Sequence, residues 1–262
     1  MIEKGGMDMR ELEDIRRELD SCDEELARLL ERRMDLIREL TAEKKAKGLP
    51  QLKAKGRRQK GTLISRLEAS RYGRECRGVA DSILRAEKKV QAGALCPGNI
   101  ALIGFMGAGK SSVSHYLRDM LAMDEVETDE LIVEAEGMSI ADIFEKQGEG
   151  YFRRVESQVI RRLRGKKGVV ISCGGGVVMR EENVQNLKAS SRIVLLSAFP
   201  ETILDRVKGS TKRPILNGHM DVGYIRDLME KRRASYQAAA DLEVATDGKD
   251  VAQICEEILA RI

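Results

Sequence analysis

The chain has 262 residues, and 42% of them are hydrophobic, so it can bury a core in one large domain or two ordinary ones. Only 3% are aromatic and none is Trp, which predicts an aliphatic core. The net charge is +3, and no apolar run approaches the roughly 20 residues that a bilayer crossing requires. The polar start of the chain and its five scattered cysteines predict a cytoplasmic protein with reduced thiols and no membrane partner.

A long helical pattern covers residues 8–47. Its apolar seam repeats at alternating three- and four-residue steps through Leu12, Ile15, Leu19, Cys22, Leu26 and Leu29. The same spacing places Arg33 on this seam, where a guanidinium is costly unless an anionic group meets it. The pattern therefore predicts a packed helix in which the guanidinium of Arg33 meets an anionic group.

Two further helices are predicted, over roughly residues 57–72 and 74–91, and the Gly- and Pro-containing residues 93–98 indicate a linker. Residues 1–92 are thus predicted to form an all-α three-helix domain. Three helices alone bury little apolar surface for a stable core. We expect this domain to form a homodimer.

Between Lys44 and Lys60 the chain carries eight basic residues and no acidic one. Such a run forms either a solvated loop, a nucleic-acid patch or a pocket for small anions. No aromatic residue interrupts it, although stacking on bases requires aromatic side chains. We therefore expect no nucleic-acid partner.

From residue 99 onward, short Val- and Ile-rich runs alternate with helical patterns. Strands are predicted at residues 100–103, 168–172 and 193–196. Helices are predicted at residues 113–121, 140–146, 155–163, 200–207, 222–239 and 251–262. This alternation predicts an α/β domain over residues 99–262, with a parallel sheet and helices on both faces.

The first of these strands leads directly into the pattern G-x-x-x-x-G-K-S, which ends at Lys110 and Ser111. Glycines allow the backbone amides to surround a phosphate, the lysine reaches the outer phosphates, and the hydroxyl can ligate Mg²⁺. The pattern predicts an ATP site with Mg²⁺, at Gly107, Ala108, Gly109, Lys110, Ser111 and Ser112.

Two acids, Glu127 and Asp129, stand where the second strand should end, on the ligand side of such a sheet. They suit a metal contact and a contact to the phosphate acceptor, although Asp129 could equally cap the next helix. Arg153 follows a Gly-rich turn and is placed to grip a carboxylate, unless it is an ordinary surface arginine.

Three glycines, Gly174, Gly175 and Gly176, follow the strand at 168–172, and close approach of a ligand explains them better than packing. Residues 208–214 are basic and flexible in composition, which suits a lid that brings Arg213 to the transferring phosphoryl group. Another arginine, Arg232, lies on the last long helix.

Taken together, these motifs make residues 99–262 resemble the shikimate kinases. The resemblance rests on G-F-M-G-A-G-K-S at 104–111, T-D-E-L-I at 128–132, G-E-x-x-F-R-x-x-E at 148–156, S-C-G-G-G at 172–176, R-P-I-L at 213–216 and R-x-x-x-Y at 232–236. It implies a P-loop kinase that phosphorylates the 3-hydroxyl of shikimate with Mg²⁺ and ATP, in aromatic amino acid biosynthesis.

The resemblance also implies roles for individual residues. Asp129 would orient the 3-hydroxyl or act as base, Arg153 and Arg232 would hold the substrate carboxylate, and Gly174, Gly175 and Gly176 would line the ring. Lys110 and Arg213 would act on the phosphates, and Arg206 would stack on adenine. Glu127 replaces the family's usual Asp near Mg²⁺, beside Ser111.

Residues 8–91 resemble the all-helical, dimeric chorismate mutases, through I-R-R-E-L-D-S-C-D-E-E-L at 15–26 and L-L-E-R-R at 29–33. The resemblance places Arg16, Arg33, Lys44, Arg57 and Gln91 around chorismate. The acids that the family carries in its second helix are missing. The domain is therefore either a mutase that forms prephenate, or a dimerisation or regulatory module that binds chorismate or prephenate.

Two other functions compete with this interpretation. The first is another P-loop small-molecule kinase, such as a gluconate or nucleoside-monophosphate kinase, which would not need both Arg153 and Arg232 for a carboxylate. The second is a nucleotide-dependent switch that uses the basic stretch on nucleic acid.

Overall fold

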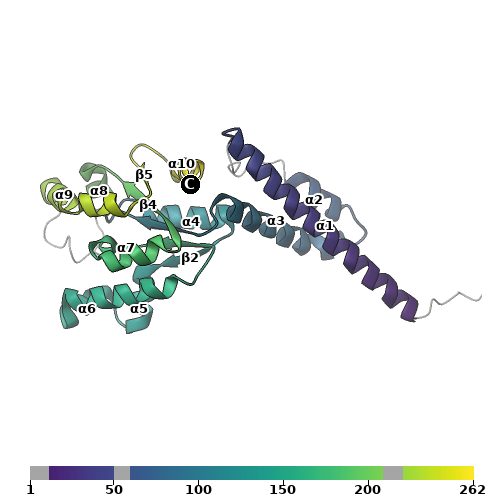
Figure 1. Ribbon diagram of the computed structural model, residues 1–262, viewed down its shortest axis with the longest axis horizontal. Coiled ribbons are helices and arrows are strands. Elements are labelled where there is room, and N and C mark those ends of the chain that lie inside the picture. Colours follow the sequence, from purple (N-terminus) through teal and green to yellow (C-terminus); the bar gives the residue numbers. More distant parts are fainter. Residues whose placement is uncertain (1–11, 50–59, 209–220) are drawn as a thin grey trace, which may run out of the picture.

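The computed structural model describes residues 12–49, 60–208 and 221–262. A helical region and an α/β domain lie at opposite ends of an elongated molecule (Figure 1). The helical region consists of α1 (Leu12–Ala46), α2 (Lys60–Glu68) and α3 (Gly73–Leu95), which confirms the three predicted helices. Within the described ranges, no helix has both the length and the apolar character that a membrane crossing needs.

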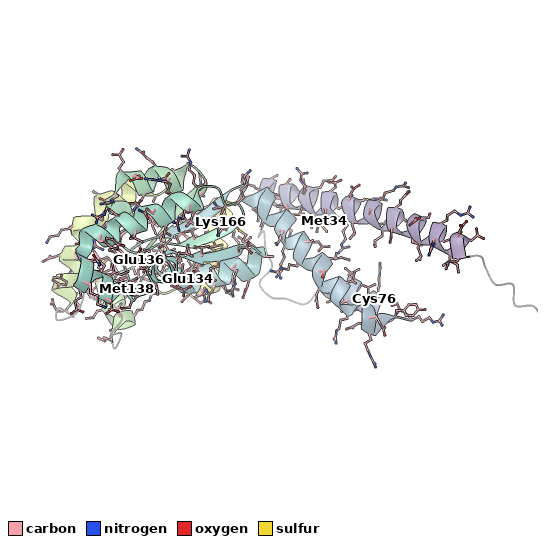
Figure 2. The ribbon with its side chains drawn as sticks, turned by 90° about the horizontal axis from the view of Figure 1, so that it is seen from below. Met34, Cys76, Glu134, Glu136, Met138 and Lys166 are labelled. Carbon is pink, nitrogen blue, oxygen red and sulfur yellow. The ribbon has the colours of Figure 1, made fainter. Side chains whose placement is uncertain are left out.

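The apolar seam of α1 lies on its surface in this single chain. Only Thr41 of this helix is buried, whereas seven large apolar side chains are at least 40% exposed. They are Leu12, Ile15, Leu19, Leu26, Leu29, Leu36 and Leu40. In Figure 2, α1 and α3 diverge away from the α/β domain, so neither covers the full length of the other. Within the described residues, no other element therefore packs over the full length of this apolar seam.

The expected linker at 93–98 is partly wrong, because α3 continues to Leu95. Ala92 and Cys96 belong to the hydrophobic core of the α/β domain, and burial of these side chains extends the helix into that core. The ammonium of Lys88 also donates to the carbonyl of Asp119 on the adjoining domain, at 3.0 Å. The two regions are thus joined by a packed helix.

Five parallel strands form the sheet, in the order β2-β3-β1-β4-β5. They are β1 (Asn99–Ile103), β2 (Asp124–Glu127), β3 (Val169–Ser172), β4 (Ser191–Ser197) and β5 (Leu242–Ala245). The three predicted strands correspond to β1, β3 and β4. In the register of the sheet, Ser172 pairs with both Leu102 and Glu127, so β1, β2 and β3 end at one edge.

Helices cover both faces of this sheet, as predicted. They are α4 (Lys110–Leu121), α5 (Thr128–Glu136), α6 (Ile140–Leu163), α7 (Glu181–Lys188), α8 (Pro200–Val207), α9 (Val222–Ala239) and α10 (Val251–Arg261), with a short 3₁₀ turn η1 (Val177–Met179). Alternate residues of β1 point to opposite faces, so Ile100 and Leu102 join a core with α4 and α10. Ala101 and Ile103 join the core formed with α6, α7 and α9.

Candidate active site

The phosphate loop connects β1 to α4 with three glycines in left-handed conformations. Their φ angles are +141° at Gly104, +80° at Gly107 and +97° at Gly109. A Cβ on Gly104 would lie 2.3 Å from the carbonyl oxygen of Leu196, so only glycine fits there. Lys110 folds back over the loop, and its Nζ donates to the carbonyls of Gly104 and Phe105 at 3.0 and 3.1 Å. This geometry forms a cradle for phosphate at the start of a helix.

Arg206 extends from α8 to the same loop. Its Nη1 donates to the carbonyl of Gly107 at 3.3 Å and to the hydroxyl of Thr246 at 2.9 Å, while Nη2 donates to the carbonyl of Thr246 at 3.2 Å. The structure therefore brings Arg206 beside the phosphate cradle, together with Ser111 and Ser112 in the first turn of α4. Thr246 follows β5, and nothing in the sequence singled it out.

The three glycines after β3 lie between the residues predicted to bind substrate. A Cβ on Gly174 would approach Oδ1 of Asp129 to 2.6 Å, and a Cβ on Gly176 would approach Nη1 of Arg153 to 2.3 Å. On the other side, Gly175 lies close to the phosphate loop, because a Cβ there would be 3.6 Å from the amide nitrogen of Met106. The predicted substrate residues and the phosphate cradle thus meet at this turn.

Arg153 is not a surface arginine. Its side chain is about 10% exposed, and its Nη1 donates to both carboxylate oxygens of Glu156, at 3.1 and 3.0 Å. Its Nη2 donates to Oε1 of Glu149 at 3.1 Å. Burial lowers the pKa of Arg153, but the two carboxylates outweigh it and hold that pKa above its ordinary value. The guanidinium is therefore permanently charged and fixed in orientation.

Glu156 is the partner that sequence reasoning missed, although it stands inside the G-E-x-x-F-R-x-x-E element. Its side chain is 1% exposed. Burial raises the pKa of Glu156, the Arg153 guanidinium opposes this shift, and the nearby charge of Asp129 adds to it. A buried carboxylate in this place fixes the arginine that faces the glycine turn.

Arg232 and Tyr236 approach the turn from α9. The Arg232 Nη1 lies 3.5 Å from the carbonyl oxygen of Gly175, and its guanidinium carbon lies 5.9 Å from the ring centroid of Phe105. The hydroxyl of Tyr236 donates to the same Gly175 carbonyl. Burial raises the pKa of Tyr236, which keeps this hydroxyl protonated as a donor. Tyr236 was part of a recognised motif but had no predicted role.

The end of β2 supplies the acids. Oε1 of Glu127 is buried and has no hydrogen-bond partner among the described residues. The next residue, Thr128, accepts a hydrogen bond from the amide of Gly174 at 2.9 Å, which fixes the start of α5 and hence the position of Asp129. An orphaned carboxylate oxygen at this edge suits a hydrated cation.

In the helical region, the Nε of Arg33 donates to the carboxylate of Glu87 on α3. Lys44 and Gln91 lie further along α1 and α3, and both helices run toward the α/β domain (Figure 1). Arg16 precedes Arg33 by 17 residues, which is about 25 Å along a straight helix, so one chain does not bring these two arginines together. Two predicted site residues, Arg57 and Arg213, lie outside the described residues.

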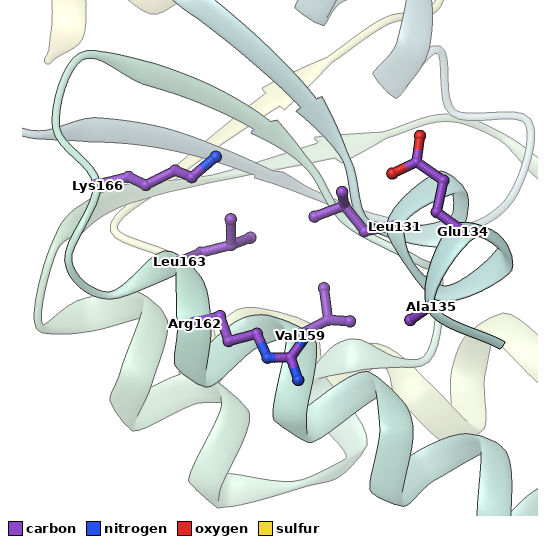
Figure 3. Close-up of a pocket in the computed structure, with 7 residues that line it drawn as sticks. All are labelled: Leu131, Glu134, Ala135, Val159, Arg162, Leu163 and Lys166. Atoms are coloured by element: carbon purple, nitrogen blue, oxygen red, sulfur yellow. The ribbon is translucent and has the colours of Figure 1, made fainter.

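A cavity of about 350 Å³ lies elsewhere, between α5 and α6 (Figure 3). It is lined by Leu131, Glu134, Ala135, Val159, Arg162, Leu163 and Lys166. None of these residues belongs to the predicted sites, so the cavity is distinct from the glycine turn.

A phosphate loop between the central strand of a parallel sheet and the helix that follows it defines the domain as a P-loop nucleotide-binding domain. The family model described as "Shikimate kinase" matches residues 106–262, and the model "Chorismate mutase type II" matches residues 15–86. The chain belongs to the shikimate kinase family and carries a type II chorismate mutase domain ahead of the kinase domain.

Named relatives and solved structures agree with this assignment. The chain is 43% identical over 160 residues to the shikimate kinase of Dehalococcoides mccartyi, covering 61% of this chain and 90% of the relative. Identity to the Persephonella marina shikimate kinase is 42% over 164 residues, covering 63% and 98%. The structure of Acinetobacter baumannii shikimate kinase in complex with shikimate matches with a TM-score of 0.60 and 32% identity, covering 62% of this chain and 90% of the other.

Proposed function

We propose that the kinase domain transfers the γ-phosphoryl group of ATP to the 3-hydroxyl of shikimate, giving shikimate 3-phosphate and ADP in aromatic amino acid biosynthesis. One observation carries the proposal: a buried, fixed arginine and an aspartate flank a glycine turn that adjoins the phosphate loop. A cation without freedom to move suits a carboxylate-bearing acceptor, and the adjacent aspartate suits its hydroxyl.

The substrate side of the site has three functions. Arg153 and Arg232 bind the carboxylate, and Gly174, Gly175 and Gly176 allow the ring to approach the backbone. The carboxylate of Asp129 orients the 3-hydroxyl and accepts its proton as the oxygen bonds to the γ-phosphorus and the bond to the bridging β–γ oxygen breaks. Because Arg153 is already ion-paired, this binding requires little reorganisation of the protein.

The nucleotide side uses the loop amides of Gly107, Ala108 and Gly109, with Lys110 as a point charge on the outer phosphates. Arg206 contacts adenine from the rim of the loop, and Arg213 supplies charge to the transferring group. Ser111 and Ser112 complete the first turn of α4.

Mg²⁺ fits the residues at this edge of the sheet. Ser111 would ligate it directly and Glu127 would hold one of its waters through the buried oxygen that has no other partner in the described chain. When bound, the ion supplies charge neutralisation on the phosphates.

The test compares ADP release with shikimate and with its methyl ester as acceptors. We expect turnover with shikimate, and a KM for the ester higher by at least about tenfold, since the ester lacks the negative charge that Arg153 and Arg232 are proposed to bind. Equal KM values for the two acceptors would contradict a carboxylate-binding role for Arg153 and Arg232. Turnover of gluconate or a nucleoside monophosphate, but not of shikimate, would favour the rival kinase functions.

We propose that the helical domain forms a homodimer and binds chorismate between α1 and α3. The exposed apolar seam of α1 supports the dimer, and the separation of Arg16 from Arg33 supports a site that a second copy completes. Arg33, Lys44, Gln91 and Arg57 would provide the remaining contacts. Chorismate consumption by the full chain, compared with buffer, distinguishes a mutase from a module that only binds chorismate or prephenate.

A further inference from the structure

Glu87 places a negative charge inside the group of residues proposed to bind chorismate. It lies on α3, its side chain is 9% exposed, and its carboxylate accepts a hydrogen bond from Nε of Arg33. The Arg33 side chain is 42% exposed, so the ion pair has one buried and one accessible member. The anion that the sequence required beside Arg33 is thus supplied by the protein itself.

The spacing along the two helices indicates that Glu87 and Gln91 share one face of α3, and that Arg33 and Lys44 share one face of α1. Lys44 follows Arg33 by 11 residues, which is close to three helical turns and places both cations on one face of α1. Gln91 follows Glu87 by one turn on α3. A ligand held by Arg33, Lys44 and Gln91 would therefore bring its own carboxylate beside the carboxylate of Glu87.

We propose that Glu87 competes internally with the carboxylates of chorismate for Arg33, and so lowers the affinity of the helical domain for this dianion. The inference rests on the chorismate site proposed above. Two carboxylates that share one guanidinium repel each other, and the repulsion is strongest where water is partly excluded. A Glu at this position therefore tunes the domain toward weak binding.

Removal of Arg33 is an ambiguous test of this site. Replacing it by Ala would leave the Glu87 carboxylate buried without its partner, which destabilises the packing of α3 against α1 in addition to any loss of ligand contact. Replacing Glu87 by Gln removes the negative charge and keeps Arg33, so it tests the proposed competition without the loss of a ligand contact.

The experiment titrates chorismate into the full-length protein by calorimetry, using wild type, Glu87→Gln and the control Glu24→Gln. Glu24 is also ion-paired on the helical domain, with Arg28 at 3.1 Å, but its side chain is 70% exposed. We expect Glu87→Gln to bind chorismate about tenfold more tightly, and Glu24→Gln to bind like wild type. Circular dichroism and ADP release with shikimate should remain unchanged in both variants, and Glu87→Ser should repeat the gain.

Other outcomes separate the two proposals. If wild type binds chorismate and neither Glu87→Gln nor Glu87→Ser binds it more tightly, the competition is refuted while the chorismate site stands. If folded wild type and both variants show no binding, the chorismate site itself is wrong and the competition with it.

Discussion

At Arg153 the chain holds a mostly buried guanidinium against the buried carboxylate of Glu156 and the exposed carboxylate of Glu149, and this arrangement makes its geometry more important than its charge. We expect Arg153→Lys to raise the KM for shikimate by about tenfold or more, because an ammonium cannot form the same paired hydrogen bonds to a carboxylate. Steady-state kinetics should show a smaller change in the KM for ATP.

Arg154→Lys is the matched control for this prediction. Arg154 is the next residue, but it is exposed and lies over the ring of Tyr151. Its replacement should leave both KM values within about twofold of wild type, as expected for surface positions. An unchanged KM for shikimate in Arg153→Lys would show that this arginine does not bind the acceptor.

Asp129 lies next to the glycine turn and is proposed to receive a proton. Asp129→Asn keeps the shape of the side chain but removes its basicity, so kcat should fall by about 10²- to 10⁴-fold while the KM for shikimate changes little. Rapid-quench measurement of a single turnover would place the loss in the chemical step. The neighbouring, exposed Glu130→Gln should retain kcat, and a kcat near wild type in Asp129→Asn would exclude the base role.

The sequence identified the residues that carry chemistry better than the residues that position them. Asp129, Arg153 and the glycine turn stand in recognisable patterns, and the structure brings them together. Glu156 and Tyr236 act through one buried ion pair and one hydrogen bond, and such contacts depend on side-chain packing that spacing does not encode. The need for an anion beside Arg33 could be predicted, but its source on another helix could not.

At the scale of single elements, α6 contains a break that sets the direction of Arg153. Gly148 has φ +78° and ψ 168°, a conformation essentially restricted to glycine, and the second part of the helix starts after it. Gly148→Ala should therefore lower the free energy of unfolding by about 1–3 kcal/mol and raise the KM for shikimate. Thermal unfolding and kinetics measure the two effects.

Gly150 provides the control within the same helix. A Cβ there meets nothing within 4 Å, and its φ is not in the left-handed region. Gly150→Ala should leave the KM for shikimate unchanged and stabilise the protein by up to about 1 kcal/mol. A Cβ meets nothing within 4 Å at Gly148 either, so equal effects of the two substitutions on stability would contradict a requirement for the backbone conformation of Gly148.

Prediction of the elements did not follow their length alone, since α7 has eight residues like α8 but had no predicted range. The ranges of α8 and α9 were predicted to the residue. By contrast β5 was missed, since it has only four residues and alternates buried with exposed positions. The linker boundary failed for a different reason: Ala92 and Cys96 pack into the kinase core, and this tertiary contact overrides the local Gly and Pro signals.

At the scale of the whole molecule, the kinase domain has its own core, whereas the helical domain exposes the apolar side of its longest helix. Burying a fully exposed leucine contributes about 1.5–3 kcal/mol. The leucines of this seam are 43–63% exposed, so each contributes roughly half of that when a second copy covers the seam. We expect the full chain to be a dimer, and Leu29→Glu to shift it toward monomer in sedimentation velocity, because Leu29 is 57% exposed on this seam.

Glu31→Lys is the control for this prediction. Glu31 lies on the opposite side of α1, so its replacement should leave the dimer intact. The kcat for shikimate phosphorylation should stay within about twofold in both variants, since the phosphate loop and glycine turn lie in the kinase domain. A Leu29→Glu protein that sediments as wild type would mean that the seam of α1 is not the dimer interface.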